Sequence, residues 1–401
     1  MEALSPDPIC LCRFTRHIRK VHRVPALGID PFGWLAAALD IATRRGAEVL
    51  LPVQEQVTVM SLARERIAGA GLRTAVPDFG ALAQVQDKVA AFGTLTRLGL
   101  PQPRASVAVT RAELEAVTEL PVLVKTPIGT ASAGVRLVSS DSGLRQLATR
   151  YAADGVFEAG GVLVQQQADG PLVMVQSVFA SGSLLAFHAC ERVREGANGG
   201  ASHKRSLHLP QVQEYVAALG AALGWHGALS ADLILSAAGP QFIDINPRLV
   251  EPVNAQRSGV DLAGALVEVA RSGSAPVRAA TVRAATVRPA GTPDVHTHQL
   301  LLAILGAAQH GGRRRDVLRT LGQAIAHRQA YRGSTEELTP IRGTGSSHLR
   351  GLDPLAIVPV VAATLATLIR PDTWHYFTGG ATTAYSLTPA AWQQLQHAQI
   401  P

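Results

Sequence analysis

SADLILSAAGPQFIDINPR, residues 230–248, contains two strand-like runs joined by a turn-forming segment. Runs of this kind around a Ser-Ala-Ala-Gly-Pro junction are typical of an antiparallel hairpin. A hairpin centred on Ala238 places Asp232 directly opposite Asp244. Side chains alternate between faces along a strand, so Asn246 shares a face with Asp244. The segment therefore predicts a sheet that carries carboxylate and amide oxygens close together on one face.

Carboxylates at directly opposed strand positions need a compensating charge. Their Cβ atoms lie about 4.5–5.5 Å apart, and like charges at that separation destabilise the pair. A carboxylate–amide oxygen set suits Mg²⁺, with phosphate oxygens and water completing its shell. Asp232, Asp244 and Asn246 are therefore the predicted metal ligands, and Arg248 can reach a phosphate by a bidentate contact. The alternative is that Asp232 faces solvent and the register differs by a residue or two.

A small-residue loop follows a lysine at the end of another strand-like run. The segment PVLVKTPIGTASAGVRLVS, residues 121–139, reads as strand, loop and strand, and Lys125 ends the first strand. Glycine and small hydroxyl residues let backbone N–H groups approach phosphate oxygens closely. The order of parts excludes a P-loop, whose lysine precedes a helix, and a protein kinase, whose glycine loop precedes the lysine. The alternative is an ordinary hairpin with a flexible tip.

Several motifs stand in the order of an ATP-grasp enzyme. They are Lys88 after Gln86-Asp87, Lys125 with its glycine loop, VQQ at 164–166 before Gly170, and FIDINPR at 242–248. Over residues 45–275 the chain resembles that superfamily, and it is most similar to the carboxylate–amine ligase branch, which includes D-aspartate ligase-like proteins. The tail over 334–387 is also similar to the C-terminal region of that branch.

The resemblance implies roles for the residues that match its motifs. A set of cofactor-binding residues would hold the phosphates and adenine of ATP: Lys88, Lys125, Gly129, Thr130, Ala131, Ser132, Ala133, Gly134, Val164, Gln165, Gln166, Ala168 and Lys204. Of these, Val164, Gln165 and Ala168 would form the interdomain hinge. The sequence departs from the family at Gln165 and Leu172, where acidic residues often contact adenine and ribose.

The resemblance also implies metal and catalytic residues. Asp232, Asp244 and Asn246 would hold Mg²⁺, and Mn²⁺ could take its place. Three arginines would act as catalytic residues on the transferred phosphate or the substrate: Arg248, Arg205 and Arg192. In the alternative interpretation, Arg192, Lys204 and Arg205 are solvated loop charges.

The resemblance implies an α/β (α+β) fold with three parts. Residues 1–83 would form a truncated Rossmann-like domain, because Met1 enters about where the second or third strand of such a domain should be. Residues 84–275 would form the ATP-grasp domain, with a lid subdomain over 84–163 and a metal and substrate subdomain over 164–275. Residues 276–401 would be mostly helical, with apolar or amphipathic helices expected at 299–310, 313–329 and 354–369. For the short first part, either a start site placed too far downstream or a genuinely reduced domain is left open.

Composition excludes several classes of protein. The chain has 401 residues, 47% of them hydrophobic and 17% charged, so it is neither disordered nor of low complexity. The apolar run at 354–369 is shorter than the roughly 20 residues of a membrane span, and no signal-peptide pattern opens the chain, which predicts a cytoplasmic protein without a membrane partner. The three cysteines cannot build a disulfide framework. Residues 271–350 are strongly basic, but the chain uses Arg almost throughout and aromatic residues are scarce there, which disfavours nucleic-acid binding.

The predicted function follows from the resemblance together with the predicted site. An ADP-forming, ATP-dependent ligase would phosphorylate a carboxylate to an acyl phosphate and join it to an amine. Both substrates would be small molecules, with amino-acid-like compounds favoured by the basic residues, and a homodimer is left open. Two alternatives are another ATP-grasp reaction, such as carboxylase-like activation of bicarbonate, and a catalytically degenerate nucleotide-binding protein.

Overall fold

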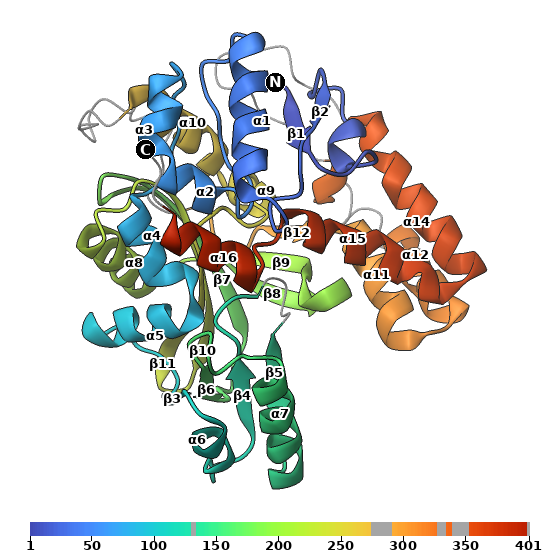
Figure 1. Ribbon diagram of the computed structural model, residues 1–401. Coiled ribbons are helices and arrows are strands. Elements are labelled where there is room, and N and C mark those ends of the chain that lie inside the picture. The colour runs from blue at the N-terminus through green and yellow to red at the C-terminus, as the bar shows by residue number, and fades with distance from the viewer. Residues whose placement is uncertain (130–133, 274–290, 327–333, 339–352, 399–401) are drawn as a thin grey trace.

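The computed structural model describes residues 1–129, 134–273, 291–326, 334–338 and 353–398. Within these ranges the strands form three sheets, and helices surround them (Figure 1). The two larger sheets are separate units of the sequence, one built from residues before Gln167 and the other from residues after it. This α/β arrangement with a helical C-terminal region is the predicted fold class.

The N-terminal region pairs two short strands in parallel and follows them with helices. β1 (Ala3–Ser5) pairs with β2 (Val21–Arg23), and Val49 makes a further parallel bridge to Arg73. The helices are α1 (Pro31–Arg44), α2 (Val57–Leu62), α3 (Arg64–Gly69) and α4 (Phe79–Gln86), with the 3-10 turn η1 (Leu11–Arg13) between the strands. Asp30 caps α1 by accepting from the Gly33 N–H, with Pro31 in its first turn, as helix N-termini favour.

The first large sheet has four antiparallel strands in the order β3-β6-β4-β5. The strands are β3 (Ala105–Ala108), β4 (Val122–Lys125), β5 (Val135–Val138) and β6 (Val162–Gln166). Helices α6 (Arg111–Glu115) and α7 (Asp141–Ala153) bury Leu114 and Leu144 against Val124 and Val162 on one face. The opposite face of the sheet is thereby left to α5 (Lys88–Arg97) and to the second large sheet.

The second large sheet has six strands in the order β11-β10-β7-β8-β9-β12. These are β7 (Leu172–Ala180), β8 (Ser183–Glu195), β9 (Ala201–Leu207), β10 (Gly227–Ser236), β11 (Gly239–Asn246) and β12 (His296–His298), with the 3-10 turn η2 (Ala197–Gly199) after β8. On one face Val175, Leu229 and Phe242 join a core with Val216 and Leu219 of α8 (Pro210–Ala222). Near one end of the other face, α9 (Val253–Ser258) and α10 (Leu262–Ser272) cover the sheet.

Helices fill the C-terminal region, close to the predicted positions. They are α11 (Leu300–Gly311), α12 (Arg314–Ala326), α14 (Ile357–Ile369), α15 (Trp374–Tyr385) and α16 (Pro389–His397), with 3-10 turns η3 (Glu336–Leu338), η4 (Pro354–Ala356) and η5 (Pro371–Thr373). The last three residues of the helix expected at 313–329 lie outside the described ranges. α16 returns to the N-terminal region, where the Trp392 ring lies 5.7 Å from Phe79 (Figure 1).

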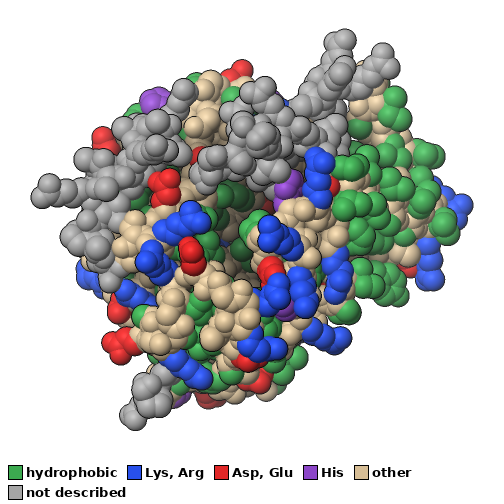
Figure 2. Space-filling view, turned by 90° about the horizontal axis from the view of Figure 1, so that it is seen from above, with side chains coloured by type: hydrophobic (Ala, Val, Ile, Leu, Met, Phe, Trp, Pro, Cys, Tyr) green, Lys and Arg blue, Asp and Glu red, His purple; other side chains and the backbone are tan. Residues whose placement is uncertain are grey.

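The outer C-terminal helices carry much exposed apolar surface. Ile357, Val361, Leu365 and Ile369 repeat every four residues along α14 and are 43–71% exposed. Figure 2 shows hydrophobic side chains gathered on this side of the molecule. None of the helices within the described ranges is both long and apolar enough to cross a membrane.

Candidate functional site

The predicted pairing of Asp232 with Asp244 is confirmed. They lie opposite each other in the antiparallel β10–β11 pair, and Ser230 lies opposite Asn246. The turn is tighter than expected, because Ser236 already pairs with Gly239, and an irregularity after Asp232 restores the register. The opposed carboxylates therefore sit beside a bulge, a feature that often re-aims side chains next to active sites.

Cross-strand pairing extends this site into a polar sheet face. Ser230 pairs with Gln176 of β7, which pairs with His188 of β8, so all three share the face of Asn246. Ser230 Oγ donates to the Arg248 carbonyl oxygen at 2.5 Å, and Gln176 Oε1 accepts from the Val250 N–H at 3.0 Å. These side chains therefore fix the loop that follows β11 above the carboxylates.

The environment of Asp232 disfavours its ionised form. Burial, followed by the charge of Asp244, raises the pKa of Asp232 to about 7, although Arg248, Arg192 and Lys125 act against the rise. A cation bound nearby would stabilise the ionised form of Asp232. Among the residues that the structure describes, no three His, Cys, Asp or Glu side chains form a metal-binding group. Metal binding here thus needs Asn246 and oxygens from outside the chain.

Lys125 and Lys88 connect the two large sheets beside these carboxylates. Lys125 Nζ donates to the Ile243 carbonyl oxygen at 2.8 Å, across from β4 to β11. Lys88 Nζ donates to the Gly129 carbonyl oxygen at 2.9 Å and lies 3.9 Å from Asp244 Oδ1. Burial lowers the pKa of Lys125 to about 8, in spite of the nearby Asp244. Both ammonium groups therefore sit where the predicted loop and the predicted metal site meet.

The glycine loop is described only at its two ends. Gly129 accepts the Lys88 hydrogen bond, and Gly134, with φ of +82°, accepts the Thr126 N–H at 2.9 Å. A Cβ at Gly134 would collide with the Thr126 hydroxyl, so this position needs glycine. The predicted phosphate contacts of Thr130, Ala131, Ser132 and Ala133 lie outside the described residues.

The predicted hinge residues face different sides of β6. Gln165 is 2% exposed and its Oε1 has no hydrogen-bond partner. It lines a cavity of about 20 Å³ together with Lys88, Asp244 and apolar neighbours. Val164 instead packs in the core under α6 and α7, and Gln166 donates to Glu119. Ala168 lies in the segment that joins the two large sheets.

Two of the three predicted catalytic arginines lie at the polar sheet face. Arg248 Nη1 is 3.5 Å from Glu55 Oε1, and Arg192 Nη1 donates to the Gly199 carbonyl oxygen at 2.6 Å. Glu55 lies just before α2 and is 4% exposed, with Oε2 accepting from the Leu387 N–H. No signal in the sequence points to Glu55, because Arg248 and Leu387, which its carboxylate contacts, lie 193 and 332 residues away in the chain.

Arg205 does not join them. It is one residue from Lys204 on β9, so its side chain points to the opposite face of the sheet. There Arg205 Nη2 lies 2.5 Å from Glu191 Oε2, in an ion pair across the strands. Arg205 is therefore left out of the site that we propose, and the physical reason is the two-residue alternation of a strand.

Lys204 lies in a buried ion-pair network. Its Nζ is 2.6 Å from Glu251 Oε2 and 2.9 Å from Glu336 Oε2, and its side chain is 2% exposed. Burial alone would lower the pKa of Lys204, but the charges of Glu251 and Glu336 outweigh it and hold the pKa above its ordinary value. Thr297 Oγ1 also donates to Glu336 Oε1, at 2.6 Å. These contacts tie the loop after β11 to η3, and they use the donors of Lys204 that were predicted to hold phosphate.

Comparison with known proteins gives one family match, in the central part of the chain. The family model of the ATP-grasp domain matches residues 85–252. No curated protein matches the sequence.

Solved structures share the fold at low identity. One is the biotin carboxylase domain of Hydrogenobacter thermophilus 2-oxoglutarate carboxylase with MgADP and bicarbonate (18% identity, TM-score 0.55, 68% of this chain and 70% of that chain). Another is Campylobacter jejuni biotin carboxylase in a β,γ-ATP complex (18% identity, TM-score 0.55, 70% of this chain and 65% of that chain). A third is the L-amino acid ligase of Bacillus licheniformis (16% identity, TM-score 0.51, 68% of this chain and 67% of that chain). The likeness of these structures concerns the fold alone, and the family match identifies residues 85–252 as an ATP-grasp domain.

Proposed function

We propose that the protein is an ADP-forming, ATP-dependent carboxylate–amine ligase. The observation that carries the proposal is the pair of opposed carboxylates, Asp232 and Asp244, with Lys88 and Lys125 beside them. A carboxylate is a poor acyl donor, because its leaving group would be an oxide. Phosphorylation by ATP gives an acyl phosphate with a good leaving group, which an amine then attacks, releasing phosphate. Such chemistry depends mainly on positioning and on neutralising charge.

The metal ligands of this proposal are Asp232, Asp244 and Asn246. Their oxygen donors and the raised pKa of Asp232 fit a hard divalent cation, Mg²⁺ or Mn²⁺. When bound, the metal neutralises charge on the phosphates of ATP. The irregularity after Asp232 and the Ser230 hydrogen bond to the following loop hold the donors in place.

The two lysines exchange partners when nucleotide enters. In the structure each ammonium donates to a neutral carbonyl oxygen, Lys125 to Ile243 and Lys88 to Gly129. Phosphate oxygens are stronger acceptors for these ammonium groups than the carbonyls are, because their negative charge adds a direct attraction between opposite charges. Both lysines can thus turn to ATP with little loss, and Arg248 would meet the transferred phosphate.

Gln165 is the residue that would read the adenine. Its buried Oε1 lacks a donor, and an unpaired buried acceptor costs about 1–3 kcal/mol. The exocyclic amino group of adenine would satisfy it. The neighbouring cavity of about 20 Å³ is large enough only for a water molecule. Adenine therefore requires the two large sheets to move apart, around the segment that contains Ala168.

The substrate would lie along the polar sheet face. Arg192 and Arg248 flank the carboxylates there, and both counteract the rise in the pKa of Asp232. Cationic groups beyond those that serve ATP suit substrates with a free carboxylate, such as amino acids. No side chain of the site is assigned as the base that deprotonates the amine.

An ADP-release assay tests the proposal. Wild-type protein with ATP and Mg²⁺ is screened against amino acids and small carboxylates with amines, and against bicarbonate in a separate series. Asp244→Asn should lose most of the turnover while the fold survives. The surface variant Asp40→Asn should retain it, since Asp40 is exposed and pairs with Arg44 on α1. Turnover with bicarbonate alone would favour the carboxylase-like alternative. ATP binding without turnover would favour a degenerate nucleotide-binding protein, and near-wild-type turnover in Asp244→Asn contradicts the metal site.

The setting of the reaction is part of the same proposal. We expect the ligase to act in the cytoplasm, without nucleic acid or a membrane as its partner. A homodimer would be recognised by light scattering on the purified chain. Cell fractionation tests the location.

A further inference from the structure

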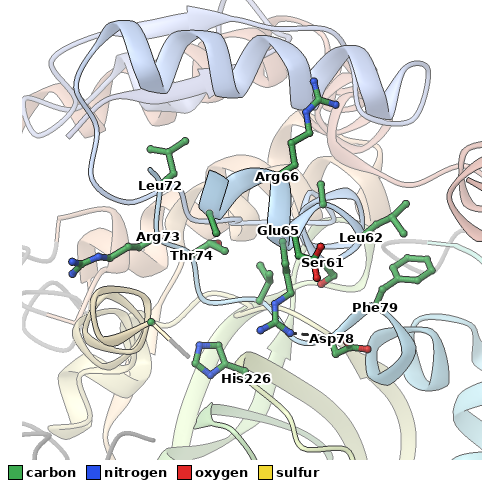
Figure 3. A pocket seen from close by; sticks show the side chains of 15 residues that line it. Ser61, Leu62, Glu65, Arg66, Leu72, Arg73, Thr74, Asp78, Phe79 and His226 are labelled. Carbon is green, nitrogen blue, oxygen red and sulfur yellow. Dashed lines mark ion pairs between the residues drawn. The ribbon is translucent and has the colours of Figure 1, made fainter. Parts of the chain in front are cut away.

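A second cavity, of about 540 Å³, shares no residue with the proposed catalytic site. Its walls come from the end of α2, from α3, from the segment before α4, and from His226 and Gly273 (Figure 3). His226 directly precedes β10, and Asp232 follows it six residues later. Six extended residues span about 20 Å, so the cavity lies far along the strand from the carboxylates. Its volume is typical of sites for small ligands.

His226 lies at the floor of this cavity with little exposed surface (Figure 3). The side chain is 7% exposed, and within the part of the chain that the structure describes its ring nitrogens have no hydrogen-bond partner. Figure 3 shows the imidazole pointing into the cavity from its floor. Burial, together with the charge of Arg64, lowers the pKa of His226 to about 4. A neutral imidazole with unused donor and acceptor atoms therefore faces the open space.

Other polar groups of the wall also lack partners. Ser61 Oγ and Thr74 Oγ1 are buried without a hydrogen bond. Arg64 Nη1 is 3.9 Å from Asp78 Oδ2, beyond hydrogen-bond distance, and the Asp78 side chain is 76% exposed. Most buried polar side chains in native proteins are paired, so two unpaired hydroxyl groups in the wall of one cavity call for an explanation.

The charge and the walls define what would fit. Three arginines, Arg64, Arg66 and Arg73, line the cavity against two acidic residues, Glu65 and Asp78, so its lining is net positive. Arg66 and Arg73 extend outward from the rim in Figure 3. Leu62, Leu72 and Phe79 supply apolar wall. A ligand that matches both features has an anionic group and an apolar part.

We propose that this cavity binds a small organic anion, whose carboxylate or phosphate group accepts hydrogen bonds from Arg64 and His226. The negative charge of the ligand offsets that of Arg64, so that His226 can also take up a proton. The site is independent of the proposed ligase reaction, because none of its residues contacts the metal ligands or the lysines.

Thermal unfolding of the full chain tests the proposal. The probes are sodium phosphate and sodium citrate, each compared with sodium chloride at equal ionic strength. The variants are Arg64→Gln and His226→Gln, with Arg145→Gln on the exposed face of α7 as the matched control. Wild type and the control should be stabilised by at least one probe, and the apparent Kd should weaken at least tenfold in Arg64→Gln. The probe that acts distinguishes a phosphate ligand from a carboxylate.

Two outcomes overturn the proposal. One is stabilisation of equal size in wild type, control and Arg64→Gln, which would place anion binding elsewhere, including at the ATP site. The other is no stabilisation of wild type by either probe up to 20 mM. If His226→Gln unfolds by itself, Arg64→Gln still decides, because Arg64 is 36% exposed and its replacement leaves the core intact. ATP binding by Arg64→Gln should equal that of wild type.

Discussion

Replacing Lys204 by Met separates two roles for this residue. The resemblance to ATP-grasp enzymes implies that Lys204 contacts ATP phosphate, whereas in the structure its ammonium is held by Glu251 and Glu336. Met keeps the apolar stem and removes the charge. The two carboxylates are then left without their cation, and Glu336, whose side chain is 4% exposed, cannot reach bulk water. We therefore expect a loss of stability rather than a selective loss of ATP affinity.

The size of the loss follows from burial. Removing one partner of a buried ion pair costs about 3–5 kcal/mol, because the remaining charge is uncompensated. At 2–4 °C per kcal/mol for a large domain, the melting temperature should fall by roughly 6 °C or more. Adding Glu336→Gln to Lys204→Met should restore part of this loss, because it removes the buried charge that lost its cation. Arg44→Met, which breaks an exposed i,i+4 pair with Asp40, should change stability by less than about 0.5 kcal/mol.

Calorimetry of these variants and titration with MgATP give the two readouts. A Lys204→Met protein that melts within 1 °C of wild type would refute the structural role. If that protein also bound MgATP at least tenfold more weakly, the phosphate role taken from the sequence would be restored. Loss of stability without the partial rescue by Glu336→Gln would mean that the network does not act as a unit.

Three further predictions concern single residues. Burial lowers the pKa of His188 to about 4, so the unfolded chain takes up a proton first as the pH falls. The free energy of unfolding should therefore drop by about 3 kcal/mol between pH 6.5 and pH 4. Urea melts of His188→Gln should show a flatter dependence of this free energy on pH. Gly220→Ala should cost about 1–3 kcal/mol, since its Cβ would strike the Phe179 ring, whereas Gly69→Ala meets open space and should gain up to about 1 kcal/mol in the same melts. Gln165→Leu should leave the melting temperature of the free protein unchanged or higher, while calorimetric titration should show weaker ATP binding.

The strands that carry the site were predictable because their signals are local. Turn chemistry and short apolar runs placed the β10–β11 hairpin within a few residues. The pairing of Asp232 with Asp244 came out right through two compensating differences. The turn closes one residue tighter than expected, at Ser236 and Gly239, and the irregularity after Asp232 adds that residue back. The pairing of the two carboxylates was thus predicted correctly, although the length of the turn was not.

The partners of the site could not be predicted, because they are distant in sequence. Glu55 reaches Arg248 from 193 residues away, and Glu336 reaches Lys204 from 132. Neither carboxylate stands in a motif, and a backbone bridge between Thr335 and His298 of β12 brings the neighbouring Glu336 to the sheet. The position of Arg205 was different, since the alternation of side chains along β9 already separates it from Lys204. The same alternation that was applied to the hairpin predicts that Arg205 and Lys204 lie on opposite faces of β9.

The alternation of side chains also explains how the polar face of the second large sheet serves both stability and chemistry. Residues two apart on each strand fall on the same face, so cross-strand pairs align Asn246, Ser230, Gln176 and His188 in one row. His188 Nε2 in turn donates to Asn254 Oδ1 on α9, and the Asn254 amide nitrogen donates to Thr297, which connects to the Glu336 network. A change at Glu336 therefore perturbs the contacts of Lys204, which also holds Glu251 in the loop after β11. For this reason a variant in the network should be judged by its melting temperature before any loss of turnover is read as catalytic.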